Sequence, residues 1–108
     1  MASIYKILGQ TAPAAETLTT LYTVPASTSA VCSTLSICNR GISTQVRVAV
    51  RPAGDTVANQ HYIVYDVAIN QYESVFLTLG VTLAATDVVS VYAGTADVSF
   101  GLFGTEVV

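Results

Sequence analysis

The fold is decided by residues 44–51, TQVRVAVR, which form the clearest β-strand pattern in the chain. The three valines alternate with other side chains, and successive side chains of a strand point to opposite faces of a sheet. This period of two is typical of a strand whose valines face a core and whose two arginines lie on the other face. Residues 51–55, RPAGD, then predict a turn, because proline fixes φ and glycine frees it.

The same alternation recurs along the chain, and helical periodicity is nearly absent. Turn residues separate short strands at spacings of roughly 8–12 residues, which is typical of a sandwich or barrel. We therefore predict an all-β fold, an antiparallel two-sheet β-sandwich of about eight strands with jelly-roll or immunoglobulin-like topology. The expected strands are residues 3–8, 17–24, 31–39, 44–51, 61–69, 74–79, 87–93 and 97–105, with 56–60 and 80–85 as connections.

The core is expected from the inward positions of these strands. Within residues 31–39 the odd positions are the more apolar, which assigns Val31 to the core and Cys32 to the opposite face. The predicted core residues are Val31, Leu35, Ile37, Val46, Val48, Val50, Val89 and Val91.

Residues 1–108 are predicted to form one domain, because this length is typical of a single domain. Residues 1–10 are a candidate N-terminal arm, since a chain end is free to leave a sandwich and add to the edge of another sheet. No apolar run approaches the ~20 residues that span a bilayer. The start, MASIYK, lacks the basic and apolar regions of a signal peptide. We expect a protein kept in the cytoplasm where it is made, with no membrane partner.

Charged residues make up only 10% of the chain, against about 25% in an ordinary soluble domain. Charge keeps protein surfaces apart in water, so much of this surface is expected to be covered by partners. The formal net charge is −3, and the cations are Lys6, Arg40, Arg47 and Arg51. Four cations are too few for a phosphate-binding footprint, which argues against a nucleic-acid partner.

Residues that could carry chemistry are few and scattered. His61 is the single histidine, and strand alternation puts it on the face opposite Asp66. A catalytic base needs a nucleophile and an orienting group nearby, and no paired metal-ligand spacing occurs. The sequence therefore predicts no catalytic, metal or cofactor site and no enzymatic activity. Tyr62 and Tyr65 are expected on opposite faces, as packing residues rather than a binding platform.

Cys32 and Cys38 lie on one predicted strand, ~20 Å apart. A disulfide needs Cα atoms within about 7 Å, so we expect two separate, reduced thiols. Arg47 and Arg51 share one strand face at a spacing of about 13 Å. They are either solvated surface arginines or contacts for an acidic neighbouring subunit, and the sequence leaves both interpretations open.

An ordered set of short motifs resembles small β-sandwich virion proteins of tailed bacteriophages. The motifs run in order across nearly the whole chain: YKILGQ at 5–10, LYTVP at 21–25, ICNRG at 37–41, VAVRPAG at 48–54, HYIVYD at 61–66, LTLG at 77–80 and LFG at 102–104. The resemblance implies an architecture and a setting, and it carries over no active site.

By this resemblance the chain is a virion protein, made in the bacterial host cytoplasm, that decorates or cements the capsid. Its partners are then the major capsid protein and other copies of itself, usually as a homotrimer. The candidate contacts are Ile4, Tyr5 and Lys6 in the N-terminal segment, together with Arg47 and Arg51. Two alternatives stay open: a small tail, baseplate or fibre-attachment component, and a carbohydrate-binding adhesion module, against which the absence of tryptophan counts.

Overall fold

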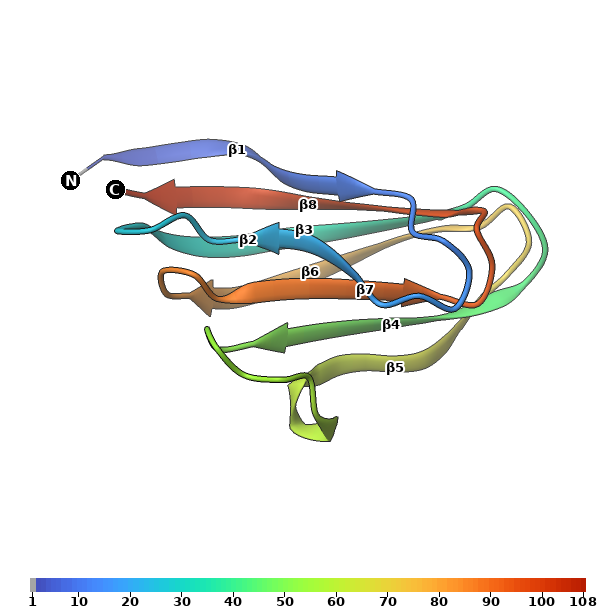
Figure 1. The fold of residues 1–108 in the computed structure, drawn as a ribbon. Helices are drawn as coiled ribbons and strands as arrows, with labels where there is room; N and C mark the ends of the chain where they lie inside the picture. Colours follow the sequence, from blue (N-terminus) through green and yellow to red (C-terminus); the bar gives the residue numbers. More distant parts are fainter. Residues whose placement is uncertain (1) are drawn as a thin grey trace.

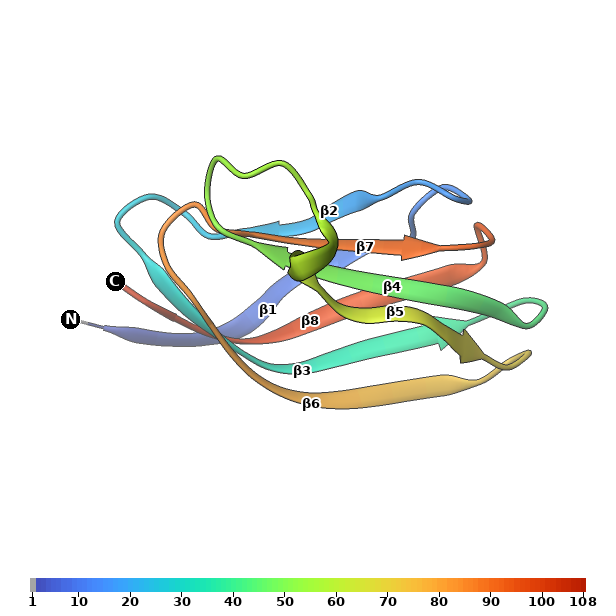
Figure 2. The same ribbon diagram turned by 90° about the horizontal axis from the view of Figure 1, so that it is seen from below.

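The computed structural model describes residues 2–108, which form eight strands and one short 3-10 turn. Two antiparallel four-stranded sheets result: sheet A in the order β1-β8-β3-β6 and sheet B in the order β2-β7-β4-β5 (Figure 1). Figure 2 shows the sheets as two packed layers. The elements are β1 (Ser3–Thr11), β2 (Thr19–Thr23), β3 (Ser29–Asn39), β4 (Thr44–Arg51), η1 (Asn59–His61), β5 (Tyr62–Ile69), β6 (Ser74–Leu83), β7 (Val88–Ala93) and β8 (Val98–Val107).

The strand pairing is that of a long hairpin rolled into a sandwich. β1 pairs with β8, β2 with β7, β3 with β6 and β4 with β5. The contacts between β3 and β8 and between β4 and β7 join these pairs into the two sheets. This is the eight-strand jelly-roll arrangement. The predicted two-sheet sandwich is confirmed, and of the two expected topologies the pairing is the jelly roll.

All eight predicted strands are present, but β6 is longer than expected. Residues 80–85 were predicted to be a connection, whereas β6 continues to Leu83. Gly80 allows this continuation because it adopts φ +149°, a conformation that favours glycine. Beyond it Val81 is half-buried and Leu83 is buried, so burial of these two side chains favours the extra strand residues.

The core lies between the inner faces of the two sheets. Six of the eight predicted core residues are buried, and Val50 is half-buried against the same cluster. Val31 is the exception, since 41% of its surface is exposed. The buried members of the predicted set are Leu35, Ile37, Val46, Val48, Val89 and Val91.

A β-bulge at Ser33 explains why the prediction for Val31 is wrong. Cys32 pairs with Gly104 and Thr34 with Phe103, so two steps along β3 oppose one step along β8. The extra residue reverses the alternation, so Cys32 is buried and Val31 faces outward. Gly104 is required at this point, because a Cβ there would overlap the backbone carbonyl of Val31.

The N-terminal segment is an edge strand rather than a free arm. Ser3–Thr11 pairs with β8 along its length, with one irregularity between Ile7 and Gly9. Residues 3–7 are nevertheless exposed on both faces of the strand. The candidate arm 1–10 therefore belongs to sheet A from Ser3 onward, and Met1 lies outside the described residues. No helix within residues 2–108 is long and apolar enough to cross a membrane.

Both cysteines are free and lie on β3, as predicted. Cys32 is buried, and burial raises the pKa of its thiol to about 11, whereas Cys38 is half-buried on the outer face. We expect an alkylating reagent at pH ~8 to modify Cys38 at least about a hundredfold faster than Cys32, because alkylation needs an accessible thiolate. Peptide mass spectrometry measures both rates, and labelling in denaturant is the control. Equal rates in the folded protein, or a Cys32–Cys38 crosslink, would contradict this placement.

Candidate functional site

The outer face of sheet A, named the A face below, is an uncharged surface that the strand register defines. Its side chains lie in rows across the four strands, such as Ile7, Phe103, Thr34 and Thr78. Among residues 2–108, none in these rows is charged. The rows comprise Ser3, Tyr5, Ile7 and Gln10 of β1, Ser99, Gly101, Phe103, Thr105 and Val107 of β8, Ser29, Val31, Thr34, Ser36 and Cys38 of β3, and Ser74, Phe76, Thr78 and Thr82 of β6.

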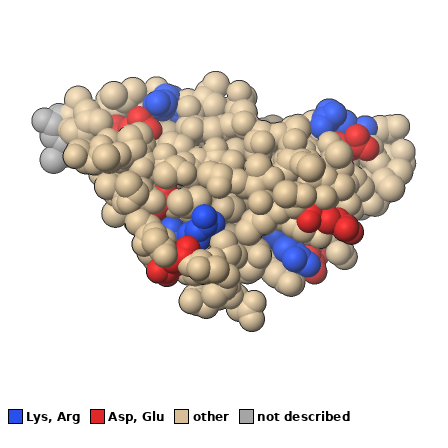
Figure 3. Space-filling model, viewed as in Figure 1, with Lys and Arg blue, Asp and Glu red and all other residues tan. Residues whose placement is uncertain are grey.

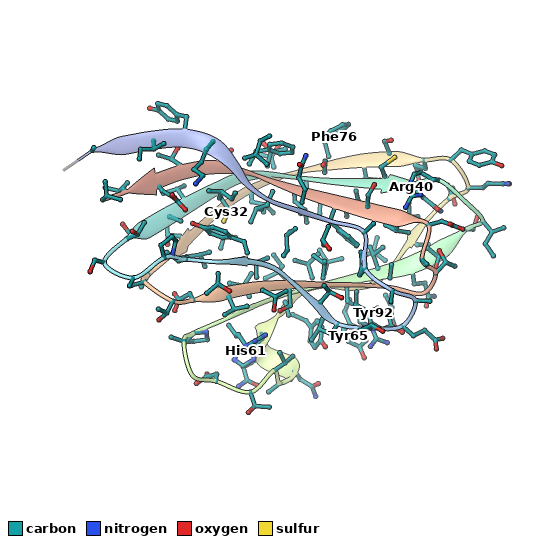
Figure 4. All side chains as sticks on the ribbon, turned by 45° about the horizontal axis from the view of Figure 1, so that its top comes forward. Cys32, Arg40, His61, Tyr65, Phe76 and Tyr92 are labelled. Atoms are coloured by element: carbon teal, nitrogen blue, oxygen red, sulfur yellow. The ribbon has the colours of Figure 1, made fainter. Side chains whose placement is uncertain are left out.

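Large apolar side chains project from the A face into solvent. Tyr5 is 84% exposed and Phe76 is 71% exposed, and both lie on edge strands of sheet A. Phe76 points away from the sheet in Figure 4. Val31, in the same row as Tyr5, and Ile7, in the row between Tyr5 and Phe76, are also exposed. Exposed apolar groups that gather on one uncharged face are typical of a protein interaction surface.

A shallow hollow of about 360 Å³ opens on the A face between the end of β1 and β3. Gln10, Ser36, Cys38 and Gly101 contribute to its lining. It exists because Gly101 has no side chain, since a Cβ there would crowd Ser36 and Phe103. The face thus combines projecting rings with a recess that a partner side chain could fill.

The cations lie away from the A face, and each has an intramolecular partner. Arg47 binds Asp66, Lys6 binds Glu106, and the Arg51 guanidinium donates to the Ser90 hydroxyl at 3.0 Å. Arg40 donates to the backbone carbonyl of Ala96 at 3.5 Å. In Figure 3, blue and red atoms accordingly lie together in small patches on a mostly tan surface.

The register separates the predicted contact residues into three places. Tyr5 belongs to the A face, whereas Ile4 and Lys6 lie on the opposite side of β1. Arg47 and Arg51 share the outer face of sheet B, as predicted from their spacing. The structure therefore does not bring the five residues together in one site, and their contacts with a partner remain a prediction.

Lys6 belongs to a polar network that closes one end of the sandwich. The Glu106 carboxylate accepts a hydrogen bond from the Tyr22 hydroxyl at 2.6 Å and one from the Lys6 ammonium at 3.3 Å. Tyr22 belongs to sheet B and the other two residues to sheet A, so the network ties the sheets together. These hydrogen bonds hold the pKa of Glu106 below its ordinary value, while burial and the Glu106 contact raise the pKa of Tyr22.

This network predicts acid sensitivity. Because the folded-state pKa of Glu106 is lowered, its contribution to stability is complete above about pH 4.3 and is lost as the pH falls through the folded-state pKa. We expect Glu106→Gln to have a lower free energy of unfolding than the parent at pH ~7. The difference between the two free energies should become smaller towards pH ~2. Urea denaturation across this range measures it. A constant difference between the two proteins at every pH would contradict the role of the carboxylate.

His61 has a structural position in the loop that covers part of sheet B. Its Nδ1 accepts a hydrogen bond from the Ala58 backbone amide at 2.9 Å, and its Nε2 lies 3.4 Å from the Asp55 carboxylate. The side chain is buried, and residues 59–61 form η1, whereas the sequence predicted a connection up to residue 60 and a strand from His61 onward. Among residues 2–108, no group of three or more His, Cys, Asp or Glu side chains could hold a metal ion.

The second surface is a polar cluster around Arg47 on the outer face of sheet B. Its guanidinium contacts both carboxylate oxygens of Asp66, at 2.6 and 3.3 Å, and this hydrogen bonding raises the pKa of Arg47 further. The Arg47 Cζ atom also lies 4.3 Å from the ring centre of Tyr65 and 4.5 Å from that of Tyr92. Figure 4 shows the two labelled tyrosines on the same side of the molecule.

The prediction that Tyr62 and Tyr65 lie on opposite faces is wrong. Their rings meet edge to face with centres 5.0 Å apart. β5 pairs with β4 irregularly: Ala49 pairs with Tyr62 but Val48 with Val64, so one additional residue interrupts the alternation. That bulge brings both rings to one side of the strand.

The chain was compared with protein-family models, curated proteins and solved structures, and none of the three comparisons gives a match.

Proposed function

We propose that this chain is a non-enzymatic structural protein of a phage virion that docks onto the assembled capsid shell through the A face. The observation that carries the proposal is the uncharged outer face of sheet A with its exposed apolar side chains. The phage setting itself comes from the resemblance of the sequence motifs. A jelly-roll fold alone hosts many functions, so it supports an architecture compatible with the proposal and no more.

The composition of the A face suits docking onto a large protein surface. Serine, threonine and valine lose little side-chain entropy when they are buried, whereas lysine and glutamate lose up to about 2 kcal/mol each. Exposed Tyr5 and Phe76 supply the large rigid rings that dominate interface energies. A face of this kind needs no charged partner, so it fits a neutral, closely packed contact.

The N-terminal half of β1 provides a second contact region within the same proposal. β1 is an edge strand of sheet A, and its residues 3–7 are exposed on both faces. An edge with free backbone groups can pair with a strand of a neighbouring subunit. Ile4 and Lys6 on one side and Tyr5 on the other would then contact that neighbour.

The many identical sites on a capsid explain how a small uncharged face could be enough for stable binding. A capsid presents the same site many times, and a homotrimer would engage several sites together, so modest affinity per contact gives high occupancy. A protein that bridges neighbouring shell subunits in this way adds contact area against internal pressure. No chemistry is required of it.

Electron microscopy of the native particle tests the proposal. We expect density for the jelly roll on the outside of the shell, with sheet A toward the capsid. Particles lacking the protein should lose heat resistance while they keep intact tails. Normal shell stability together with failed tail assembly or adsorption would overturn the proposal and favour a tail or baseplate component.

A further inference from the structure

We propose that the groove beside Arg47, on the outer face of sheet B, is a binding site for a neutral saccharide. The groove has a volume of about 400 Å³ and is lined by residues from four separate parts of the chain, including Glu16, Gln45, Arg47, Asp66 and Tyr92. It lies on the sheet opposite the A face, so the inference does not depend on docking to a capsid.

Arg47 is held rigidly at the centre of this region. Asp66 accepts hydrogen bonds from Nε and Nη2, and the two tyrosine rings lie within 4.5 Å of Cζ. A guanidinium carries five N–H groups, so three remain for a ligand or water. A fixed planar donor with unused hydrogen bonds recognises adjacent oxygen atoms with little loss of entropy on binding.

Unusual backbone conformations determine the positions of the two carboxylates of the groove. Asp66 has φ +53° within β5, and Glu16 has φ +55° in the turn before β2. The Glu16 backbone amide also donates to the carbonyl of Ala93 at the end of β7, which fixes that turn against sheet B. Left-handed conformations of residues other than glycine are uncommon, and in a strand they re-aim a side chain. Here the bulge directs Asp66 to Arg47, and the turn brings Glu16 to the groove.

The chemistry of the lining favours a neutral polyhydroxylated ligand. The groove offers donors from Arg47, acceptors from Glu16 and Asp66, and both from Gln45 and the Tyr92 hydroxyl. Each sugar hydroxyl can donate and accept a hydrogen bond, so neighbouring hydroxyls can bind both the donors and the acceptors of the groove. Two carboxylates against one guanidinium give the charged groups a net charge of −1, which disfavours phosphate, sulfate or sialic acid.

An aromatic surface continues the site along β5. Tyr65 is 54% exposed and lines a second hollow of about 390 Å³ with Asn59 and Tyr62. A sugar ring presents an apolar face of C–H groups that packs on such a ring. Asp66 lines the groove and its neighbour Tyr65 lines the hollow, so the two together fit a ligand of two or more sugar units.

A bound peptide strand fits this region less well. β5 is the edge of sheet B, but the register between β4 and β5 shifts twice, and Asp66 interrupts the regular backbone. Addition of a strand needs a regular row of free backbone groups, which bulges remove. The site therefore has to recognise its ligand through side chains.

The test titrates the full chain, labelled with ¹⁵N, with glucose, galactose, mannose, N-acetylglucosamine, lactose and cellobiose, with sialyllactose as the anionic comparison. We expect at least one neutral sugar to shift the amide signals of residues around Arg47, and a disaccharide to bind more tightly than its monosaccharide. Glu16→Gln and Tyr65→Ala should each weaken binding about tenfold or more. Glu16→Gln should leave the denaturation midpoint nearly unchanged, whereas Tyr65→Ala also removes the ring's contacts with Arg47 and Tyr62 and should lower the midpoint slightly while the protein stays folded. Phe76→Ala on the A face is the matched control and should bind like the parent.

Several outcomes would overturn the proposal. These are no shift with any neutral sugar in the panel, binding of sialyllactose alone, and binding that survives both groove variants. Loss of binding in Phe76→Ala alone would move the sugar site to the A face and would equally overturn it. The groove and the A face lie on different sheets, so absence of sugar binding at the groove leaves the proposed capsid docking untouched.

Discussion

Replacement of Leu35 by alanine is expected to lower the free energy of unfolding by roughly 2–5 kcal/mol. Leu35 is fully buried on β3, an inner strand of sheet A, and packs in the core cluster that both sheets share. The substitution removes buried apolar atoms and leaves a cavity that surrounding strands cannot fill. Since domains of this size have total stabilities of about 5–15 kcal/mol, the loss is a large fraction of the whole.

Val31→Ala is the matched control, because Val31 lies four residues earlier on the same strand but on the other side of the bulge. A change at this exposed position should stay within about 0.5 kcal/mol. Urea denaturation of both variants measures the difference. If the two variants lost similar stability, Val31 and Leu35 would face the same side of β3, and the assignment of a bulge at Ser33 would be wrong.

Strand positions were predictable because short-range alternation alone determines them. The valines of β4 alternate with polar or small side chains, and the structure buries Val46 and Val48 as this pattern requires. Turn residues such as Pro52 and Gly54 follow β4 where the sequence predicted a break. Such signals depend on neighbours in the sequence, and so they need no knowledge of the sheet.

The two errors in side-chain direction share one physical origin, which is the β-bulge. Val31 and Cys32 exchange faces because Ser33 is an extra residue relative to β8, and Tyr62 meets Tyr65 because β5 carries an extra residue relative to β4. A bulge is a property of two paired strands, so counting along one strand cannot reveal it. The positive φ of Asp66 had no sequence signal, since glycine would be the usual residue there.

The candidate surfaces were only partly predictable for a related reason. The low content of charged residues is visible in the composition. Whether uncharged residues gather on one face, the A face, depends on which strands pair. Lys6 and Glu106 are 100 residues apart in the chain, and only the pairing of β1 with β8 brings them together. Phe76 and Thr78 alternate with Val75, Leu77 and Leu79, so the sequence shows apolar residues on both faces of β6 but not which face is exposed.

A single charge on the A face is expected to remove capsid binding, if the proposed docking is correct. We expect Phe76→Asp to lower affinity for purified shells by at least about a hundredfold, because burying an unpaired carboxylate costs several kcal/mol and each 1.4 kcal/mol is tenfold in affinity. Phe76 is 71% exposed, so the folded protein should lose at most about 1 kcal/mol of stability. A co-sedimentation assay of shells with increasing protein measures the binding curve.

Tyr72→Asp separates docking from a general effect of added negative charge. Tyr72 is an aromatic residue of matching exposure, 74%, in the turn between β5 and β6 rather than in the rows of the A face. Its positive φ of +59° suits aspartate at least as well as tyrosine, so the control should fold normally. Both variants change the net charge equally, and long-range repulsion from the shell is therefore the same in each. Equal loss of binding would attribute the effect to that repulsion, whereas loss confined to Phe76→Asp requires that the outer face of sheet A be buried in the complex.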